Sequence, residues 1–235
     1  MITTPQPKIA MIAGFGDNAS MYDGLRGTVL AQKYELLPLN LPGFGAPSLE
    51  GKTTLASLAD WLAQEMEHQG ARIIAAHSVA SIIASLAAQN PKSKIDHILS
   101  LEGNLLAEDA HFSGRASEHP DPQSFLAWFT PRIAKRGEND PILARYAQEV
   151  TKADPRSLWE LGCDAHHFSE NHHPGEMLLE AAQATYFYNP DNCAAPSMKW
   201  LNSSGLQRIK LPGACHWPSI DAPEELSQAI EAALG

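Results

Sequence analysis

The stretch that decides the fold reads Ile73-Ile74-Ala75-Ala76-His77-Ser78-Val79-Ala80-Ser81-Ile82-Ile83. Its first half is a continuous apolar run of strand length, which predicts a buried β-strand. Its second half predicts a helix over residues 79–89, which Asn90-Pro91 would end. Ser78 lies at the turn between them, where a tight strand-to-helix turn projects a serine hydroxyl into the cleft above the sheet. The helix N-terminus adds unpaired N–H groups at the same place, which suits a nucleophile that forms an anion beside itself.

The rest of the chain alternates between predicted strands and helices. Further strands are predicted at residues 8–13, 35–41, 95–101, 184–189 and 206–211. This alternation indicates the α/β class, with a mostly parallel, doubly wound sheet of about six strands. Between residues 104 and 182 no strand is predicted, and three Asp-Pro pairs each mark a helix start: Asp121-Pro122, Asp140-Pro141 and Asp154-Pro155. We therefore expect a core made of residues 1–104 and 183–235, with residues 105–182 inserted as a helical cap.

Composition excludes several kinds of partner. The 235-residue chain has a net charge of -10 and no Lys/Arg cluster in its sequence, so neither nucleic acid nor a membrane is an expected partner. No apolar run approaches the ~18 residues of a membrane span, and the N-terminus lacks a signal-peptide pattern. Cys163, Cys193 and Cys215 fit free thiols in a cytoplasmic protein. We expect a small-molecule substrate, no cofactor, and a monomer or homodimer.

Four polar residues follow predicted strands: Ser78, Glu102, Asp191 and His216. Ligands of parallel sheets bind beyond the carboxyl ends of the strands, so these side chains should face one cleft. A serine nucleophile needs a base that takes its proton, and the base needs an acid that fixes its tautomer. The predicted triad is Ser78, Asp191 and His216, with Glu102 as the alternative acid. A final helix is predicted over residues 223–234, with Asp221 as its N-cap.

The segment Ala76-His77-Ser78-Val79-Ala80 resembles the nucleophile elbow, G-x-S-x-G, of the α/β-hydrolase fold, with alanine at both glycine positions. The chain order of serine, acid and histidine is similar to that family, and residues 213–218 resemble its catalytic-histidine loop. The first two strands common in the family are not predicted in this sequence. The resemblance implies a serine hydrolase with the Ser78-Asp191-His216 triad; some family members place the acid at the position of Glu102.

The segment Ala13-Gly14-Phe15-Gly16 resembles the family's His-Gly-Phe-Gly loop. The resemblance implies an oxyanion hole formed by the N–H groups of Phe15 and Val79. The family's histidine is Ala13 here, which removes a side chain that often braces the loop. The cap carries aromatic residues and no basic patch, so we expect an apolar pocket and a small or medium carboxylic ester as substrate. The substrate-binding candidates are Gly14, His77, Phe125, Trp128 and Trp217.

Other interpretations stay open at the level of sequence. The altered elbow and the missing histidine also fit a ligand-binding or receptor-like protein with little turnover, and the same triad cleaves C–C, thioester or amide bonds in some relatives. A metal site at the histidines is not predicted, because their spacing matches no helical pair or Cys/His module; they are His166, His167, His172 and His173. Gly14-Phe15-Gly16 is a weak match to a dinucleotide fingerprint, which Asn40 contradicts at the position of the required acid.

Overall fold

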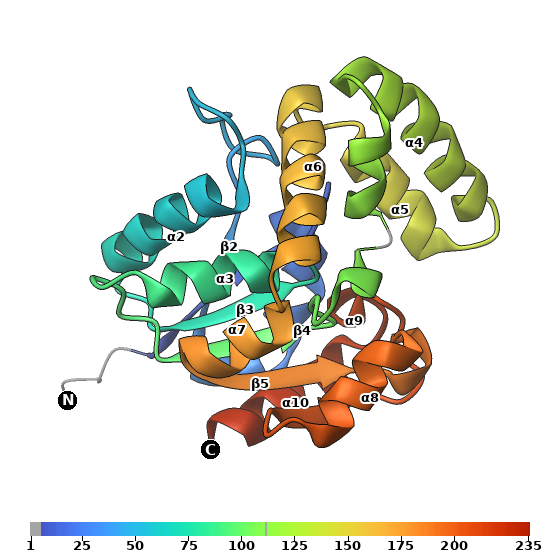
Figure 1. Cartoon of the computed structure of the whole chain (residues 1–235). Coiled ribbons are helices and arrows are strands. Elements are labelled where there is room, and N and C mark those ends of the chain that lie inside the picture. The colour runs from blue at the N-terminus through green and yellow to red at the C-terminus, as the bar shows by residue number, and fades with distance from the viewer. Residues whose placement is uncertain (1–5, 111) are drawn as a thin grey trace.

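A parallel six-stranded sheet forms the centre of the computed structural model, which describes residues 6–110 and 112–235 (Figure 1). The strands are β1 (Lys8–Ile12), β2 (Glu35–Leu39), β3 (Ile73–His77), β4 (His97–Leu101), β5 (Gln183–Tyr188) and β6 (Gln207–Lys210). They pair in the order β2-β1-β3-β4-β5-β6, with every neighbouring pair parallel. The predicted fold class and strand number are confirmed.

Helices cover both faces of the sheet, as right-handed crossovers between parallel strands require. One face carries α2 (Leu55–Gln69), α3 (Ala80–Gln89) and α7 (Pro174–Ala181) (Figure 1). Helix α8 (Ala195–Ser203) packs against α7, because Trp200 donates a hydrogen bond to Glu176 and lies against Gly175. The other face carries η1 (Ala19–Gly27), α1 (Val29–Lys33), α9 (Pro218–Asp221) and α10 (Pro223–Leu234). Because β3 lies between these layers, Ile74, Ala75 and Ala76 are fully buried, which explains its unbroken apolar run.

The sheet has a topological switch point between β1 and β3. From β1 the chain proceeds to β2 at one edge, and α2 then carries it back to β3 on the other side of β1. The loops after β1 and β3 therefore leave toward opposite faces, which opens a crevice at the carboxyl ends of these strands. Gly14 follows β1 and Ser78 follows β3, so the predicted oxyanion loop and nucleophile meet at this crevice.

The segment between β4 and β5 is helical where the structure describes it. It contains η2 (Ala107–Asp109), η3 (Ser113–Glu118), α4 (Pro122–Gly137), α5 (Pro141–Val150) and α6 (Pro155–Asn171). Asp121, Asp140 and Asp154 each accept a first-turn N–H, so the three predicted helix starts are confirmed. Figure 1 shows α4, α5 and α6 standing out from the sheet; we call η3 with α4–α6 (residues 113–171) the cap.

Buried polar contacts attach the cap to the loop between β2 and α2. The Asp154 N–H donates to the Gly43 carbonyl at 2.8 Å, and the hydroxyls of Thr53 and Ser157 lie 3.0 Å apart. Within the described ranges, no helix has the length and apolar character needed to cross a membrane.

Candidate active site

Ser78 occupies a strained turn between β3 and α3. Its φ of 54° lies in the left-handed region, which costs an L-residue roughly 1–2 kcal/mol. The Ser78 N–H donates to the Leu101 carbonyl of the neighbouring strand at 3.0 Å, which holds the turn in place. Ala76 and Ala80 are fully buried on either side, so the turn accommodates a methyl group at both elbow positions. Among the described non-glycine residues, only Ser78 and Glu102 have positive φ. Such strain concentrates at functional sites.

The loop after β1 packs directly against this turn. A Cβ atom built at Gly14 would lie 2.9 Å from the Ser78 Cβ and 2.8 Å from the His77 Nδ1, so only glycine fits. Gly14 is thus a close-packing residue and does not line the pocket. Neither the Phe15 nor the Val79 N–H donates a hydrogen bond to another described residue. Two free backbone donors therefore flank Ser78, which is the arrangement an oxyanion hole requires.

Helix α5 braces the loop after β1, which is the predicted oxyanion loop. The Tyr146 hydroxyl donates to the Phe15 carbonyl at 2.8 Å. Arg145 donates to both carboxylate oxygens of the buried Asp17, at 3.0 and 2.9 Å, and to the Ser20 hydroxyl at 2.9 Å. Burial, with the charge of Asp17, holds the pKa of Tyr146 well above its usual value, so its hydroxyl remains a donor. Helix α5 thus supports this loop, and no pattern in the sequence of α5 predicts these contacts.

His216 lies in the loop after β6, and its main chain is pinned from two sides. The His77 ring donates from Nε2 to the His216 carbonyl at 2.7 Å, because a carbonyl can only accept. The Cys215 N–H donates to the Asp221 Oδ2 at 2.6 Å. This corrects the predicted role of Asp221, because Ala222 is the N-cap of α10 while the Asp221 carboxylate holds the histidine loop.

His77 is a buried neutral histidine. Burial lowers its pKa well below 6.5, and the nearby His216 lowers it further. Its ring lies 4.7 Å from the His216 ring, so a neutral His77 adds no repelling charge when His216 takes up a proton. The residue lines the pocket, as predicted for a substrate-binding residue, while its Nε2 is committed to the histidine loop.

Glu102 is the carboxylate that the structure brings to His216. Its Oε2 lies 3.6 Å from the His216 Nδ1, within ion-pair distance and slightly beyond a hydrogen bond. Its Oε1 accepts the Asn189 N–H at 2.6 Å and the Asn192 side-chain amide at 3.2 Å. Only 4% of the Glu102 side chain is exposed. These donors aim the carboxylate at the imidazole.

Asp191, the acid predicted first, is placed elsewhere. It is exposed in the short turn η4 (Pro190–Asn192), where its N–H donates to the Asn189 side chain at 3.3 Å. The described side chains include no Asp191–His216 ion pair within 4.0 Å. The reason is local, because the strong turn sequence after β5 places the main chain and side chain of Asn189 toward Glu102 and the histidine loop, and leaves the aspartate at the surface.

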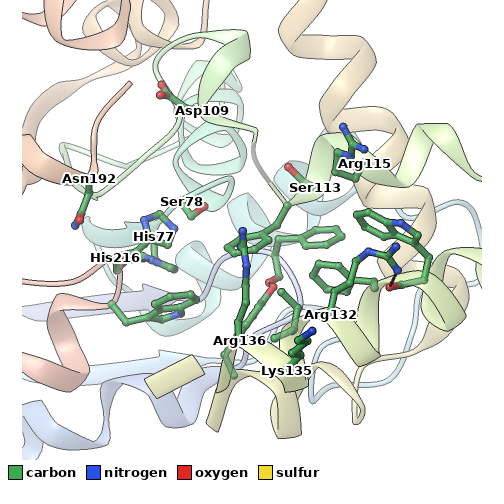
Figure 2. A pocket seen from close by; sticks show the side chains of 17 residues that line it. His77, Ser78, Asp109, Ser113, Arg115, Arg132, Lys135, Arg136, Asn192 and His216 are labelled. Carbon is green, nitrogen blue, oxygen red and sulfur yellow. Dashed lines mark hydrogen bonds between the residues drawn. The ribbon is translucent and has the colours of Figure 1, made fainter. Parts of the chain in front are cut away.

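Ser78 and His216 line the same pocket, a cavity of about 940 Å³ (Figure 2). No hydrogen bond joins the Ser78 hydroxyl to the imidazole, although both are described; such catalytic contacts often tighten only when substrate binds. Aromatic side chains make up much of the wall: Phe15, Phe112, Trp128, Phe129, Tyr146 and Trp217. Trp128 and Trp217 thus lie where substrate-binding residues were predicted. Phe125 does not, because it is fully buried and stacks behind Phe129 with 5.1 Å between ring centres.

The pocket wall also carries four cationic side chains: Arg115, Arg132, Lys135 and Arg136. Figure 2 shows them on the cap side, across from His77, Ser78 and His216. This corrects the expectation of a cap without a basic patch. The signal was present in the sequence, since positions 132, 135 and 136 are spaced to share one face of a helix.

The Cys215 thiol lies directly before His216 in the sequence. Burial raises the pKa of Cys215 to about 12, so its thiol is not a nucleophile. The part of the chain that is described contains no group of three or more His, Cys, Asp or Glu side chains placed to share a metal ion.

Comparison with known proteins identifies the fold. No protein-family model and no curated protein matches the sequence. Solved structures do match. One is an esterase from Thermogutta terrifontis with malate bound, with a TM-score of 0.75 and 18% identity; the match covers 99% of this chain and 90% of the esterase. A hydrolase from Oleispira antarctica (TM-score 0.76, 14% identity, 99% and 92%) and an enol-lactonase from Burkholderia xenovorans LB400 (TM-score 0.73, 16% identity, 100% and 93%) are also similar. With a parallel sheet, a strained serine turn at its switch point and these neighbours, the chain has the α/β-hydrolase fold.

Proposed function

We propose that this protein is a serine hydrolase that cleaves a carboxylic ester through an acyl-enzyme intermediate. One observation carries the proposal: a serine in a left-handed turn shares a pocket with a histidine whose Nδ1 faces a buried, hydrogen-bonded carboxylate. The similar structures include proteins described as esterases and an enol-lactonase, which are names for ester-cleaving chemistry.

In the proposed mechanism, the Ser78 oxygen attacks the ester carbonyl while His216 takes the serine proton. The carbonyl electron pair moves onto its oxygen, which the N–H groups of Phe15 and Val79 stabilise. The tetrahedral intermediate then collapses, the C–O bond to the leaving group breaks, and His216 gives its proton to the departing alkoxide. Water attacks the acyl-serine in the same way, so that one ester and one water become one acid and one alcohol.

We assign the orienting acid to Glu102 in place of Asp191. A carboxylate beside the Nδ1 of His216 keeps the proton on that nitrogen, which leaves Nε2 free to accept from serine. Glu102 has this position and its own supporting donors, whereas Asp191 faces solvent.

A fluorophosphonate probe tests the proposal, because it reacts covalently with an activated serine. We expect the folded protein to be labelled at Ser78 and to hydrolyse p-nitrophenyl esters, and the Ser78→Ala variant to do neither. Ser81→Ala is a matched control and should still be labelled at Ser78, since the Ser81 hydroxyl is buried and hydrogen-bonded to the Ala76 carbonyl and the Ser100 hydroxyl. A folded protein that is neither labelled nor active would refute the hydrolase and favour a ligand-binding role for the same pocket.

A further inference from the structure

The cationic side chains of the pocket have no anionic partners within it. The lining includes one carboxylate, Asp109, and its oxygens are already used: Oδ2 accepts the N–H groups of Leu105 and Leu106, and Oδ1 accepts from the Ser197 hydroxyl. Arg115 has a salt bridge with Glu118 at 2.9 Å. Within the described ranges, Arg132, Lys135 and Arg136 form no salt bridge.

Aromatic rings hold all three arginines in position, and the Arg115 guanidinium lies 5.6 Å from the Trp128 ring centre. The Arg132 guanidinium lies 4.6 Å from the Trp128 ring centre and donates to the Trp128 carbonyl at 2.8 Å. The Arg136 guanidinium lies 5.7 Å from the Phe112 ring centre. Stacking orients a planar guanidinium and leaves most of its N–H donors available. The arginines are therefore preorganised donors on the wall of the cavity.

A structural role at the helix end explains only part of this arrangement. Lys135 and Arg136 lie in the last turn of α4, where positive charge stabilises the helix dipole. That effect requires neither their position on the pocket wall nor the addition of Arg115 from η3. In a chain with a net charge of -10, four cations on the wall of one cavity also run against the overall charge.

We propose that the physiological substrate is an ester whose far end carries an anionic group, in the simplest case a carboxylate. This inference rests on the proposed hydrolase function and names the substrate class of the same pocket. The ester carbonyl lies at Ser78, the apolar chain lies along the aromatic wall, and the anion lies among Arg132, Lys135 and Arg136. Bidentate, charge-assisted hydrogen bonds from the arginines recognise the anion.

Two matched esters test the inference. The two substrates are 4-nitrophenyl hexanoate and the mono-4-nitrophenyl ester of adipic acid. Their acyl chains have the same number of carbon atoms and differ at the far end, which is a methyl group in the first and a carboxylate in the second. We expect kcat/KM to favour the adipate ester about tenfold or more, as charge-assisted hydrogen bonds allow, and added salt to reduce the ratio. In the Arg132→Gln/Arg136→Gln double variant, the ratio should fall toward one. Arg26→Gln, at an exposed arginine on η1, should leave the ratio unchanged.

The outcomes separate this inference from the function on which it rests. If the hexanoate ester is hydrolysed and the adipate ester is not preferred, the anionic substrate is refuted and the hydrolase stands. If neither ester is hydrolysed, calorimetry measures the binding of adipate to the Ser78→Ala protein. Binding that disappears when Arg132→Gln and Arg136→Gln are added supports the anion site, and absence of binding to the Ser78→Ala protein overturns it. Inhibition by adipate compared with butyl phosphate shows whether the preferred anion is carboxylate or phosphate.

Discussion

The two walls of the pocket hold their charged groups in opposite ways. The sheet wall is formed by His77, Ser78 and His216, and the buried, hydrogen-bonded carboxylate of Glu102 lies beside His216. Ser78 and Glu102 are both in strained backbone conformations. On the cap wall, which carries the four cations, the charged side chains are exposed and several are stacked on aromatic rings. The sheet wall thus carries the groups suited to chemistry, whereas the cap wall carries oriented cations suited to substrate choice. Variants in the sheet wall should change kcat, and variants in the cap wall should change substrate preference.

The largest expected effect is at Glu102. Glu102→Gln keeps the volume and an acceptor for the Asn189 N–H but removes the charge beside His216, so we expect kcat to fall about 10³–10⁴-fold. Steady-state kinetics on a p-nitrophenyl ester measures the loss. Asp191→Asn is the matched control and should stay near wild type, because Asp191 is exposed. The opposite ranking would return the acid role to Asp191.

The next effect concerns Gly14. A methyl group there would overlap the Ser78 Cβ and the His77 ring, so Gly14→Ala should displace the oxyanion loop and lower kcat roughly 10²-fold. Gly27→Ala is the control, since an added Cβ at Gly27 meets no atom within 4 Å. Equal activity of the two variants would show that the close packing of the loop is not needed for catalysis.

A smaller effect tests whether the cap only covers the pocket or also supports the chemistry. Tyr146→Phe removes the hydrogen bond to the Phe15 carbonyl, and we expect kcat to fall about tenfold as the loop loosens. Tyr22→Phe removes an equivalent 2.8 Å bond, from a buried tyrosine to the Ile12 carbonyl within β1. Tyr22→Phe should reduce thermal stability about as much as Tyr146→Phe does, while its kcat changes little. A Tyr146→Phe protein with unchanged kcat would confine the cap to substrate binding.

The smallest effect is on stability and comes from His77. Above pH 6.5 the ring is neutral in both states, so its contribution to stability is complete. As the pH falls below 6.5, His77 becomes protonated in the unfolded chain but stays neutral in the native state. The free energy of unfolding therefore declines by up to ~1.4 kcal/mol per pH unit until the pH reaches the pKa of the native ring. Urea unfolding over this range measures the slope, which His77→Gln should reduce. NMR of the native ring should show no protonation near pH 6.5; a normal titration would contradict the buried neutral state.

Much of the fold could be predicted because local patterns specify it. The short apolar run before Ser78, rich in β-branched residues, is typical of a central strand. The Asp-Pro pairs supply both a capping carboxylate and a proline in the first turn. The resemblance of residues 13–16 to the family's His-Gly-Phe-Gly loop predicted that this loop lies beside the nucleophile, and Gly14 does pack against Ser78. The choice between Glu102 and Asp191 could not be predicted, because both follow strands and only distance to His216 separates them.

By itself, the sequence determined the strand and helix order, the serine turn and the family resemblance, since each depends on residues close together in the chain. Only the tertiary structure decided which carboxylate meets the histidine, how α5 braces the loop after β1 and that cations from two cap elements share one pocket. The physical reason is that burial, hydrogen-bond partners and local electrostatic field are set by residues far apart in the chain, such as Glu102 and His216 or Phe15 and Tyr146.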